Sequence, residues 1–375
     1  MSDSAASTIA GAKAVQMGPK SNKRANPTYP PPLIIPAPAF HTHTLILLHG
    51  RGSTGSDFGP PFLQSLTTPT RTATTAAEAV AGGKTLQSHL PGLQVIFPTA
   101  KPRRARWHNR AVIRQWFDSV PIEKQDVAGQ RMTRDQAEWQ LEGLRETTHF
   151  LRPVLDAEVR AVGARNVFLG GLSQGCAMAL HLLLGYQGAS GETAGGYGDE
   201  QTASRQALGG FVGLSGWLPF VEDMEELIGS EVQKERLRGN GEDDDDPFAN
   251  SDDESAADNP FATSSSEDSV VSGCAKYPPL SPAARVCNLV RDTIDQPSIV
   301  TPEPLCLHIP VFLGHGRHDS KVRRERGLRA ARLLRDVGMR VTWREYDEGH
   351  WYKVPEEIDD VIEFLRMRME AVCGV

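Results

Sequence analysis

The chain has 375 residues, of which 39% are hydrophobic, so it is long enough to bury a large core in one or two domains. It contains no apolar run of about 18 residues, so no membrane-spanning helix or stable membrane insertion is expected. The first residues lack the basic-then-apolar order of a signal peptide. The five cysteines are scattered and odd in number, which favours reduced thiols and a cytoplasmic location.

The net charge of −7 is distributed unevenly. Gly239 to Ala275 contains eleven acidic residues and no Lys or Arg, so taking these eleven charges away leaves the rest of the chain at about +4. No basic run with interleaved aromatic residues is present, because Arg103, Arg104 and Arg106 form only a short cluster. Nucleic acid is therefore not expected as a partner.

The N-terminal third begins with a tail and then shows strand patterns. Residues 1–32 are rich in Ser, Ala, Lys and Pro and are predicted to be disordered. Leu33–Ile35 reads as a short edge strand, because prolines follow closely. His43–Leu48 and Leu93–Phe97 are apolar runs typical of buried strands. Arg103–Asp118 is predicted to be a loop.

A long helix is predicted to precede the next strand. Thr133 to Gln136 fits a capping box, and apolar residues then recur every three or four positions as far as Val159. Pro153 is expected to kink or split this helix. Apolar strand patterns follow it, over residues 166–170 and 210–214. This alternation of strands and helices predicts a mostly parallel, doubly wound α/β sheet.

Two segments interrupt the domain. Residues 185–207 are rich in Gly and Ser, and residues 229–298 are acidic, rich in Ser and without periodicity. The second segment is too long for a structureless loop in a compact domain, so it is predicted to be a disordered insertion. A single domain would then comprise residues 33–228 and 299–375. The insertion contains Asp246-Pro-Phe248 and Asn259-Pro260-Phe261, which resemble adaptor-domain ligands, although such short motifs arise more often by chance.

The C-terminal part continues the alternation. A strand over residues 310–313 leads to Asp319, a helix spans 322–337, and a strand over residues 340–346 leads to His350. A last helix is expected from Pro355 onward, since Pro is favoured in the first turn.

The pentapeptide Gly171-Leu-Ser173-Gln174-Gly175 lies between a predicted strand and a predicted helix. In a G-x-S-x-G turn the serine is held in a strained conformation at the helix N-terminus, and the glycines allow strand and helix to pack closely. A helix-capping serine in a glycine-rich turn is the alternative interpretation.

Ser173, Asp319 and His350 follow the ends of three strands in the order nucleophile, acid, base. A serine nucleophile needs a base, and the base needs a carboxylate that fixes its tautomer. Asp347 is a rival acid, three residues before His350. His315 and His318 flank Asp319, but a second group of ligands at suitable spacing is lacking, so no metal is expected there.

His49 begins a glycine-containing loop after the first buried strand. Gly50, Gly52 and Gly55 match G-x-G-x-x-G only weakly, and no P-loop is present. The other function of such a loop is to donate a backbone N–H to an oxyanion. His49 itself is interpreted as a structural ring that hydrogen-bonds the loop.

These motifs resemble the phospholipase/carboxylesterase family of α/β-hydrolases, which includes acyl-protein thioesterases. The resemblance spans about residues 33–365 outside the two insertions. It rests on segments 48–58, 97–100, 116–118, 171–175, 213–219, 314–319 and 349–350. It implies an α/β-hydrolase fold and hydrolysis of an ester or thioester, without a cofactor, through Ser173, His350 and Asp319.

The resemblance also implies roles around this triad. The backbone N–H groups of Arg51 and Gln174 would form the oxyanion hole, and Trp116 would line the acyl pocket, with Trp217 a second candidate for substrate binding. Arg51 stands where acyl-protein thioesterases commonly have Leu, and Cys176 where a second glycine is usual. Acyl-protein thioesterase, lysophospholipase and carboxylesterase activities therefore all stay open.

Two alternatives belong to other classes. The first is a catalytically idle protein of this fold that acts as an interaction module through its acidic insertion. The second is a hydrolase with a cysteine nucleophile. The sequence argues against it, because Ser173 occupies the apex of the turn and Cys176 lies three residues beyond it.

Overall fold

The computed structural model describes residues 28–69, 83–120, 133–188, 206–229, 280–301 and 303–373. A seven-stranded sheet has the order β1-β3-β2-β6-β7-β8-β9 and is parallel except for the antiparallel edge strand β1. The strands of this sheet are β1 Leu33–Ile35, β2 His43–Leu48, β3 Leu93–Phe97, β6 Val167–Leu172, β7 Gly210–Leu214, β8 Val311–Gly316 and β9 Val341–Tyr346.

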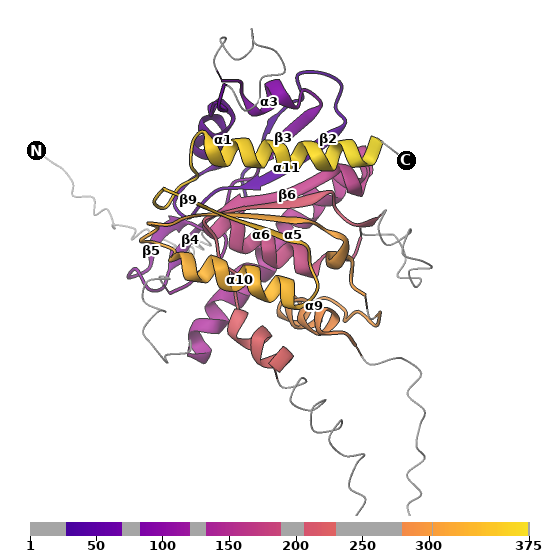
Figure 1. Ribbon diagram of the computed structural model, residues 1–375. Coiled ribbons are helices and arrows are strands. Elements are labelled where there is room, and N and C mark those ends of the chain that lie inside the picture. The colour runs from indigo at the N-terminus through magenta and orange to yellow at the C-terminus, as the bar shows by residue number, and fades with distance from the viewer. Residues whose placement is uncertain are drawn as a thin grey trace, which may run out of the picture.

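Helices cover both faces of this sheet (Figure 1). One face packs against α5 Arg134–Val162, α6 Gln174–Gly185, α9 Pro282–Thr293 and α10 Arg324–Asp336. The other face packs against α1 Gly55–Gln64, α3 Leu86–His89 and α11 Glu356–Cys373. Short 3-10 helices span Ala164–Asn166 and Leu305–His308, and residues 221–229 are also helical. The predicted doubly wound α/β architecture is confirmed.

Strand β2 illustrates why these apolar runs become central strands. Its side chains alternate between the two faces: Ile46 and Leu48 join the core beneath α5 and α6, whereas Leu45 and Leu47 join the core beneath α1 and α11. A strand with a core on each side must be apolar at every position, and all six residues of β2 are buried.

Three expectations are corrected by the structure. Pro153 does not split the helix, because α5 continues through it without a break. The predicted loop at 103–118 contains a two-stranded hairpin, β4 Pro102–Ala105 with β5 Ala111–Arg114. The predicted insertion 229–298 ends too late, because α9 lies inside its C-terminal part. Ser281 caps α9, and its buried face packs against the hydrophobic core, so residues 280–298 belong to the folded domain.

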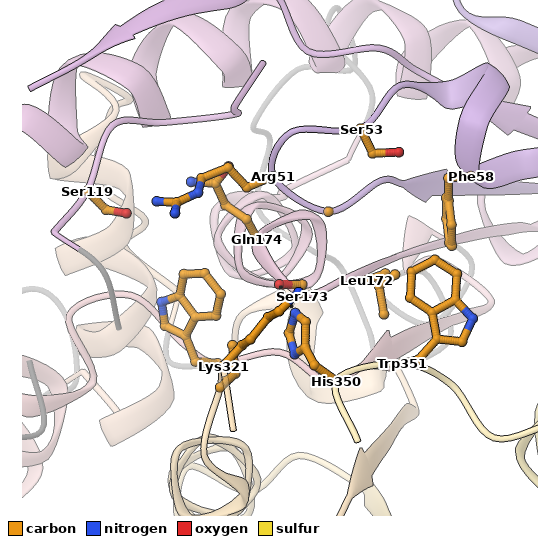
Figure 2. Close-up of a pocket in the computed structure, with 13 residues that line it drawn as sticks. Arg51, Ser53, Phe58, Ser119, Leu172, Ser173, Gln174, Lys321, His350 and Trp351 are labelled. Carbon is orange, nitrogen blue, oxygen red and sulfur yellow. Dashed lines mark hydrogen bonds between the residues drawn. The ribbon is translucent and has the colours of Figure 1, made fainter. Parts of the chain in front are cut away.

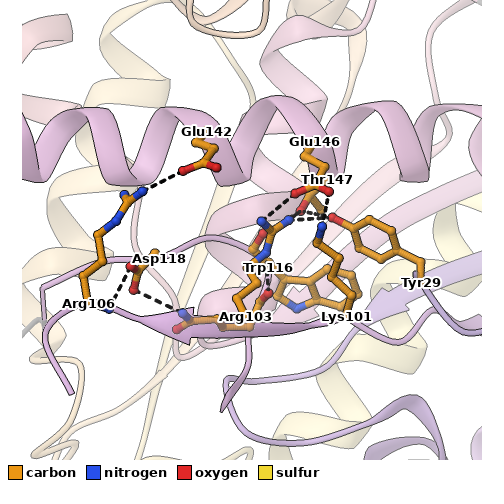
Figure 3. A network of polar contacts seen from close by, with 10 residues as sticks. Tyr29, Lys101, Arg103, Arg106, Trp116, Asp118, Glu142, Glu146 and Thr147 are labelled. Carbon is orange, nitrogen blue, oxygen red and sulfur yellow. Dashed lines mark hydrogen bonds and ion pairs between the residues drawn. The ribbon is translucent and has the colours of Figure 1, made fainter. Parts of the chain in front are cut away.

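The predicted tail also contains an ordered residue. Tyr29 stacks on Phe150 of α5, with ring centroids 4.0 Å apart, and its hydroxyl lies 2.8 Å from Thr147 Oγ1. Figure 3 shows Tyr29 beside Arg103 and Lys101, both of which pair with Glu146. Residues 1–27 of the predicted tail, the motifs at 246–248 and 259–261 and most of the acidic insertion lie outside the described residues.

Among the residues that the structure describes, no helix combines the length and the apolar character needed to cross a bilayer. The carboxyl ends of β2, β6, β7, β8 and β9 meet at one edge of the sheet, where the loops that begin at His49, Ser173, Ser215, Arg317 and Asp347 converge. In open parallel sheets this is the edge at which ligands bind.

Candidate active site

Ser173 lies between β6 and α6 with φ 57° and ψ −122°, in the strained conformation expected at the apex of the turn. Its side chain makes no capping hydrogen bond to α6, which argues against the capping-serine interpretation. A Cβ at Gly175 would collide with the Leu48 carbonyl, and one at Gly171 would collide with Gly175. Close packing of β2, β6 and α6 therefore requires glycine at both positions.

The three residues of the predicted triad lie within hydrogen-bond distance of one another. Ser173 Oγ is 2.9 Å from His350 Nε2, and His350 Nδ1 is 2.8 Å from Asp319 Oδ2. With Nδ1 donating to the carboxylate, Nε2 of the neutral ring is left to accept the serine proton. The three residues come from the ends of β6, β8 and β9, so the sheet brings together groups 177 and 31 residues apart in the chain.

The carboxylate of Asp319 is buried but well supplied with donors. Its Oδ1 accepts hydrogen bonds from the backbone N–H groups of Lys321 and Val322, at 2.9 and 2.8 Å. Burial alone would raise the pKa of Asp319, but hydrogen bonds from His315, His350 and the Val322 N–H outweigh it and hold this pKa well below its ordinary value. Asp319 is thus an anion that can support a developing imidazolium.

The alternative acid, Asp347, and the two histidines beside Asp319 have other partners. Asp347 pairs at 2.8 Å with His318, and both side chains are exposed, so Asp347 does not contact His350 as Asp319 does. His315 is buried and donates from Nε2 to the Val322 carbonyl at 2.8 Å. In the described part of the chain, no three His, Cys, Asp or Glu side chains gather as a metal would require.

The loop after β2 is held by the buried ring of His49. His49 Nε2 accepts from the Ala100 N–H at 3.0 Å, so Nδ1 carries the proton and donates to the Gly50 carbonyl at 2.7 Å. Burial lowers the pKa of His49 to about 4, which keeps the ring neutral and this tautomer in place. The structural interpretation of His49 agrees with these contacts.

The predicted oxyanion donors both border the pocket that contains Ser173. The N–H of Gln174 is the first of α6, so it has no intrahelical acceptor. The next residue of the other loop, Gly52, donates to the Arg114 carbonyl at 2.7 Å and fixes the backbone beside Arg51. The Gln174 side chain bridges the Trp116 N–H and the Phe117 carbonyl, which ties the start of α6 to the segment after β5.

The pocket around Ser173 has a volume of about 410 Å³. Figure 2 shows Phe58, Leu172 and Trp351 on one side of Ser173, and Arg51 and Ser119 on the other. The full lining comprises Gly50, Arg51, Ser53, Phe58, Ser119, Leu172, Ser173, Gln174, Trp217, Lys321, Val322, His350 and Trp351. Phe58, Ser119, Lys321 and Trp351 were not predicted as site residues. Phe58 ends the segment 48–58 of the resemblance, whereas no short motif marks the other three.

The two predicted substrate-binding tryptophans differ. Trp217 lines the pocket. Trp116 does not, which corrects the expectation: it is fully buried, and its ring N–H donates to the His49 carbonyl at 2.7 Å. Its backbone carbonyl accepts from Thr147 of α5 (Figure 3). Trp116 therefore supports the His49–Arg51 loop from below and does not contact the pocket.

Cys176 is also unsuited to the nucleophile's role. It lies in the first turn of α6, is 1% exposed, and packs so closely that a Cβ at Gly213 or Gly216 would collide with its sulfur. Burial raises the pKa of the Cys176 thiol to about 12, so the reactive thiolate is strongly disfavoured.

Comparison with known proteins relates part of the chain to a described family. The model of the phospholipase/carboxylesterase family matches residues 31–196, which include the Arg51 loop and the Ser173 turn. This match covers a little less than half of the chain, which is therefore similar to the phospholipase/carboxylesterase family over these residues. The parallel sheet with helices on both faces described above is an α/β-hydrolase fold. The family match ends before Asp319 and His350, so their arrangement rests on the geometry given above.

Two fungal proteins are similar to this chain in sequence. The chain is 30% identical over 194 residues to acyl-protein thioesterase 1 of Yarrowia lipolytica, covering 52% of this chain and 64% of the relative. It is 38% identical over 71 residues to acyl-protein thioesterase 1 of Gibberella zeae, covering 19% and 30% of the two chains. The match thus spans less than two thirds of either relative. Acyl-protein thioesterase 2 of Zea mays is similar in structure, with 19% identity and a TM-score of 0.49 over 90% of this chain and 98% of that one.

Proposed function

We propose that this protein is a serine hydrolase that cleaves carboxylic esters or thioesters through an acyl-enzyme. The similarity of residues 31–196 to the phospholipase/carboxylesterase family supports hydrolase activity. The observation that carries the specific proposal is the continuous hydrogen-bonded series from Ser173 Oγ through His350 to the buried Asp319 carboxylate, at 2.9 and 2.8 Å. It opens onto a pocket large enough for an acyl group.

In the proposed reaction His350 Nε2 takes the proton of Ser173 as the oxygen attacks the substrate carbonyl. The carbonyl π bond breaks, and the resulting oxyanion accepts hydrogen bonds from the backbone N–H groups of Arg51 and Gln174. The oxyanion then re-forms the carbonyl, the bond from the carbonyl carbon to the leaving oxygen or sulfur breaks, and His350 gives its proton to that atom. The acyl group stays on Ser173. Water activated by His350 releases the acid and regenerates Ser173.

Asp319 would hold His350 in the tautomer that this sequence of steps needs. Because hydrogen bonds keep the pKa of Asp319 low, its negative charge persists while His350 carries the extra proton. The strained backbone of Ser173 serves the same reaction, since it lifts the hydroxyl away from the sheet toward His350.

The acyl group would lie against Phe58, Leu172 and Trp351, which form the apolar side of the pocket (Figure 2). Aromatic edges pack there, with Phe58 and Trp351 ring centroids 6.4 Å apart. Both fungal relatives are named acyl-protein thioesterases, so an acylated protein is one candidate substrate beside lipid and simple esters.

The proposal is tested with p-nitrophenyl esters from acetate to palmitate, using the wild type and Ser173→Ala. We expect the substitution to lower the rate by at least about 10⁴-fold, and Asp319→Asn to lower it by a comparable factor because the wrong His350 tautomer is then favoured. The chain-length optimum then separates short-chain carboxylesterases from hydrolases of lipids or acylated proteins. A wild-type rate equal to that of Ser173→Ala at every length contradicts the proposal.

We also infer that the protein works in the reducing environment of the cytoplasm. The thiols of Cys176, Cys287 and Cys306 are all free. The five cysteines of the sequence are also scattered and odd in number, which favours reduced thiols.

A further inference from the structure

The charged side chains that line the pocket are unbalanced in sign. Apart from His350, Arg51 and Lys321 are the charged residues of the lining, both cationic, and no Asp or Glu belongs to it. Both side chains are exposed, and neither has an ion pair with a carboxylate of the described residues. Asp319, the acid that contacts His350, is already hydrogen-bonded by His350, Lys321 N–H and Val322 N–H.

The backbone that carries Arg51 and Lys321 is held by hydrogen bonds to other residues of the site. The Lys321 N–H donates to Asp319 Oδ1 at 2.9 Å, so the residue is attached directly to the proposed triad. Arg51 lies between Gly50, which is hydrogen-bonded by His49, and Gly52, which donates to the Arg114 carbonyl. The long side chains can move, but their attachment points are set relative to Ser173.

The pocket therefore has an apolar side and a cationic side around Ser173. Figure 2 shows the apolar side chains of Phe58, Leu172 and Trp351 on one side and the guanidinium of Arg51 on the other, with Lys321 beside the Ser173–His350 pair. An acyl chain suits the apolar side. The other part of the substrate, the leaving group, must then lie toward Arg51 and Lys321, where a negative charge is attracted and a positive charge is repelled.

We propose that Arg51 and Lys321 select substrates whose leaving group carries a negative charge, such as a carboxylate or phosphate close to the scissile ester or thioester. This proposal rests on the proposed function, since it assigns the leaving-group side of the same site. Arg51 can accept such a group in a bidentate manner, whereas Lys321 acts as a point charge. Because both side chains reach solvent, salt screens their attraction.

The test compares two butyrate esters. One has 4-hydroxy-3-nitrobenzoate as the leaving group and is anionic, and the other has the neutral methyl ester of the same phenol. The quantity measured is the ratio of kcat/KM for the anionic ester to that for the neutral ester, because intrinsic reactivity cancels when this ratio is compared between variants. We expect Arg51→Gln and Lys321→Gln each to lower the ratio by about two- to fivefold, the usual range for exposed charge pairs.

Three controls sharpen the comparison. Arg51→Lys keeps a positive charge and is expected to restore most of the ratio. Arg134→Gln removes an exposed arginine on α5 that is outside the pocket lining, and both rates are expected to stay at the wild-type level. Raising NaCl from about 20 to about 500 mM is expected to lower the wild-type ratio. The effect on the ratio is expected to be smaller for the double variant that carries both Arg51→Gln and Lys321→Gln.

A second pair of substrates shows which side of the ester the cations face. p-Nitrophenyl hemisuccinate carries its charge on the acyl group, and p-nitrophenyl butyrate is its neutral counterpart. If Arg51→Gln and Lys321→Gln change the ratio for this pair but not for the nitrobenzoate pair, the assignment to the leaving group is overturned. An unchanged ratio for both pairs also overturns the inference, while Ser173-dependent hydrolysis of the neutral esters leaves the proposed function standing. Absence of Ser173-dependent hydrolysis of any ester contradicts the proposed function itself.

Discussion

His315 Nε2 lies 3.3 Å from Asp319 Oδ2, the carboxylate oxygen that also accepts from His350 at 2.8 Å. The ring of His315 is buried beside Trp343, and its Nε2 donates to the Val322 carbonyl. The proposed acid is therefore held by a second histidine that does not line the pocket. His315 is one of the donors that keep the pKa of Asp319 low.

We predict that His315→Gln lowers kcat by about tenfold with little change in KM, a loss of roughly 1.4 kcal/mol of transition-state stabilisation. The reason is that the carboxylate loses a donor and holds His350 less firmly, while no contact to substrate is removed. The measurement is steady-state kinetics on p-nitrophenyl butyrate, with the unfolding temperature as a check on folding. Trp343→Phe perturbs the packing around the same ring and serves as the matched control. A folded His315→Gln protein with wild-type kcat would contradict this role.

We predict that Cys176 does not react with iodoacetamide in the native protein at neutral pH and that such treatment leaves esterase activity unchanged. Burial raises the pKa of this thiol to about 12, and the side chain is 1% exposed. Mass spectrometry of the treated native protein, with a urea-unfolded sample as the positive control, measures the modification. Loss of activity in proportion to alkylation at Cys176 would revive the cysteine-nucleophile alternative.

Glu357 of α11 gives a prediction about stability at alkaline pH. Its carboxyl accepts from the Lys353 N–H at 2.8 Å, and burial, with further repulsion from Asp360 and Glu348, raises its pKa to about 8. The folded state thus holds a proton that the unfolded chain releases near pH 4.5, so this stabilisation is complete below that pH and is lost as the pH rises through 8.

We accordingly expect Glu357→Gln to gain stability relative to the wild type as the pH rises from about 4.5 to about 8, by roughly 1 kcal/mol for each pH unit. The amide cannot ionise, yet its oxygen can still accept from the Lys353 N–H. Urea unfolding at a series of pH values gives the difference in free energy of unfolding. Parallel pH profiles for the two proteins would show that the folded Glu357 carboxyl titrates normally.

From the contacts of Tyr29 we predict that part of the N-terminal segment stabilises the fold. Tyr29→Ala removes the ring stacked on Phe150 and the hydroxyl contact with Thr147, and we expect it to lower the free energy of unfolding by about 2 kcal/mol. Tyr29→Phe keeps the ring and is expected to cost about 1 kcal/mol. Urea denaturation measures both. Equal midpoints for the wild type and Tyr29→Ala would mean that this packing adds no stability.

The sequence by itself predicted the sheet and the positions of its site loops. Apolar runs such as His43–Leu48 and the turn around Ser173 are local patterns, set by side-chain periodicity and by the backbone needs of a few adjacent residues. Because parallel strands end at one edge, the chain order of Ser173, Asp319 and His350 was enough to predict that they meet.

Only the tertiary structure decided which side chains face the pocket. Trp116 turns into the core to reach the His49 carbonyl, and Lys321 and Trp351, which no motif marks, line the site instead. Likewise α9 lies next to an acidic, Ser-rich segment in sequence but is buried against α6. The physical reason is the range of the interactions: elements and turns follow from neighbours along the chain, whereas the direction of a side chain depends on contacts with segments far away in sequence.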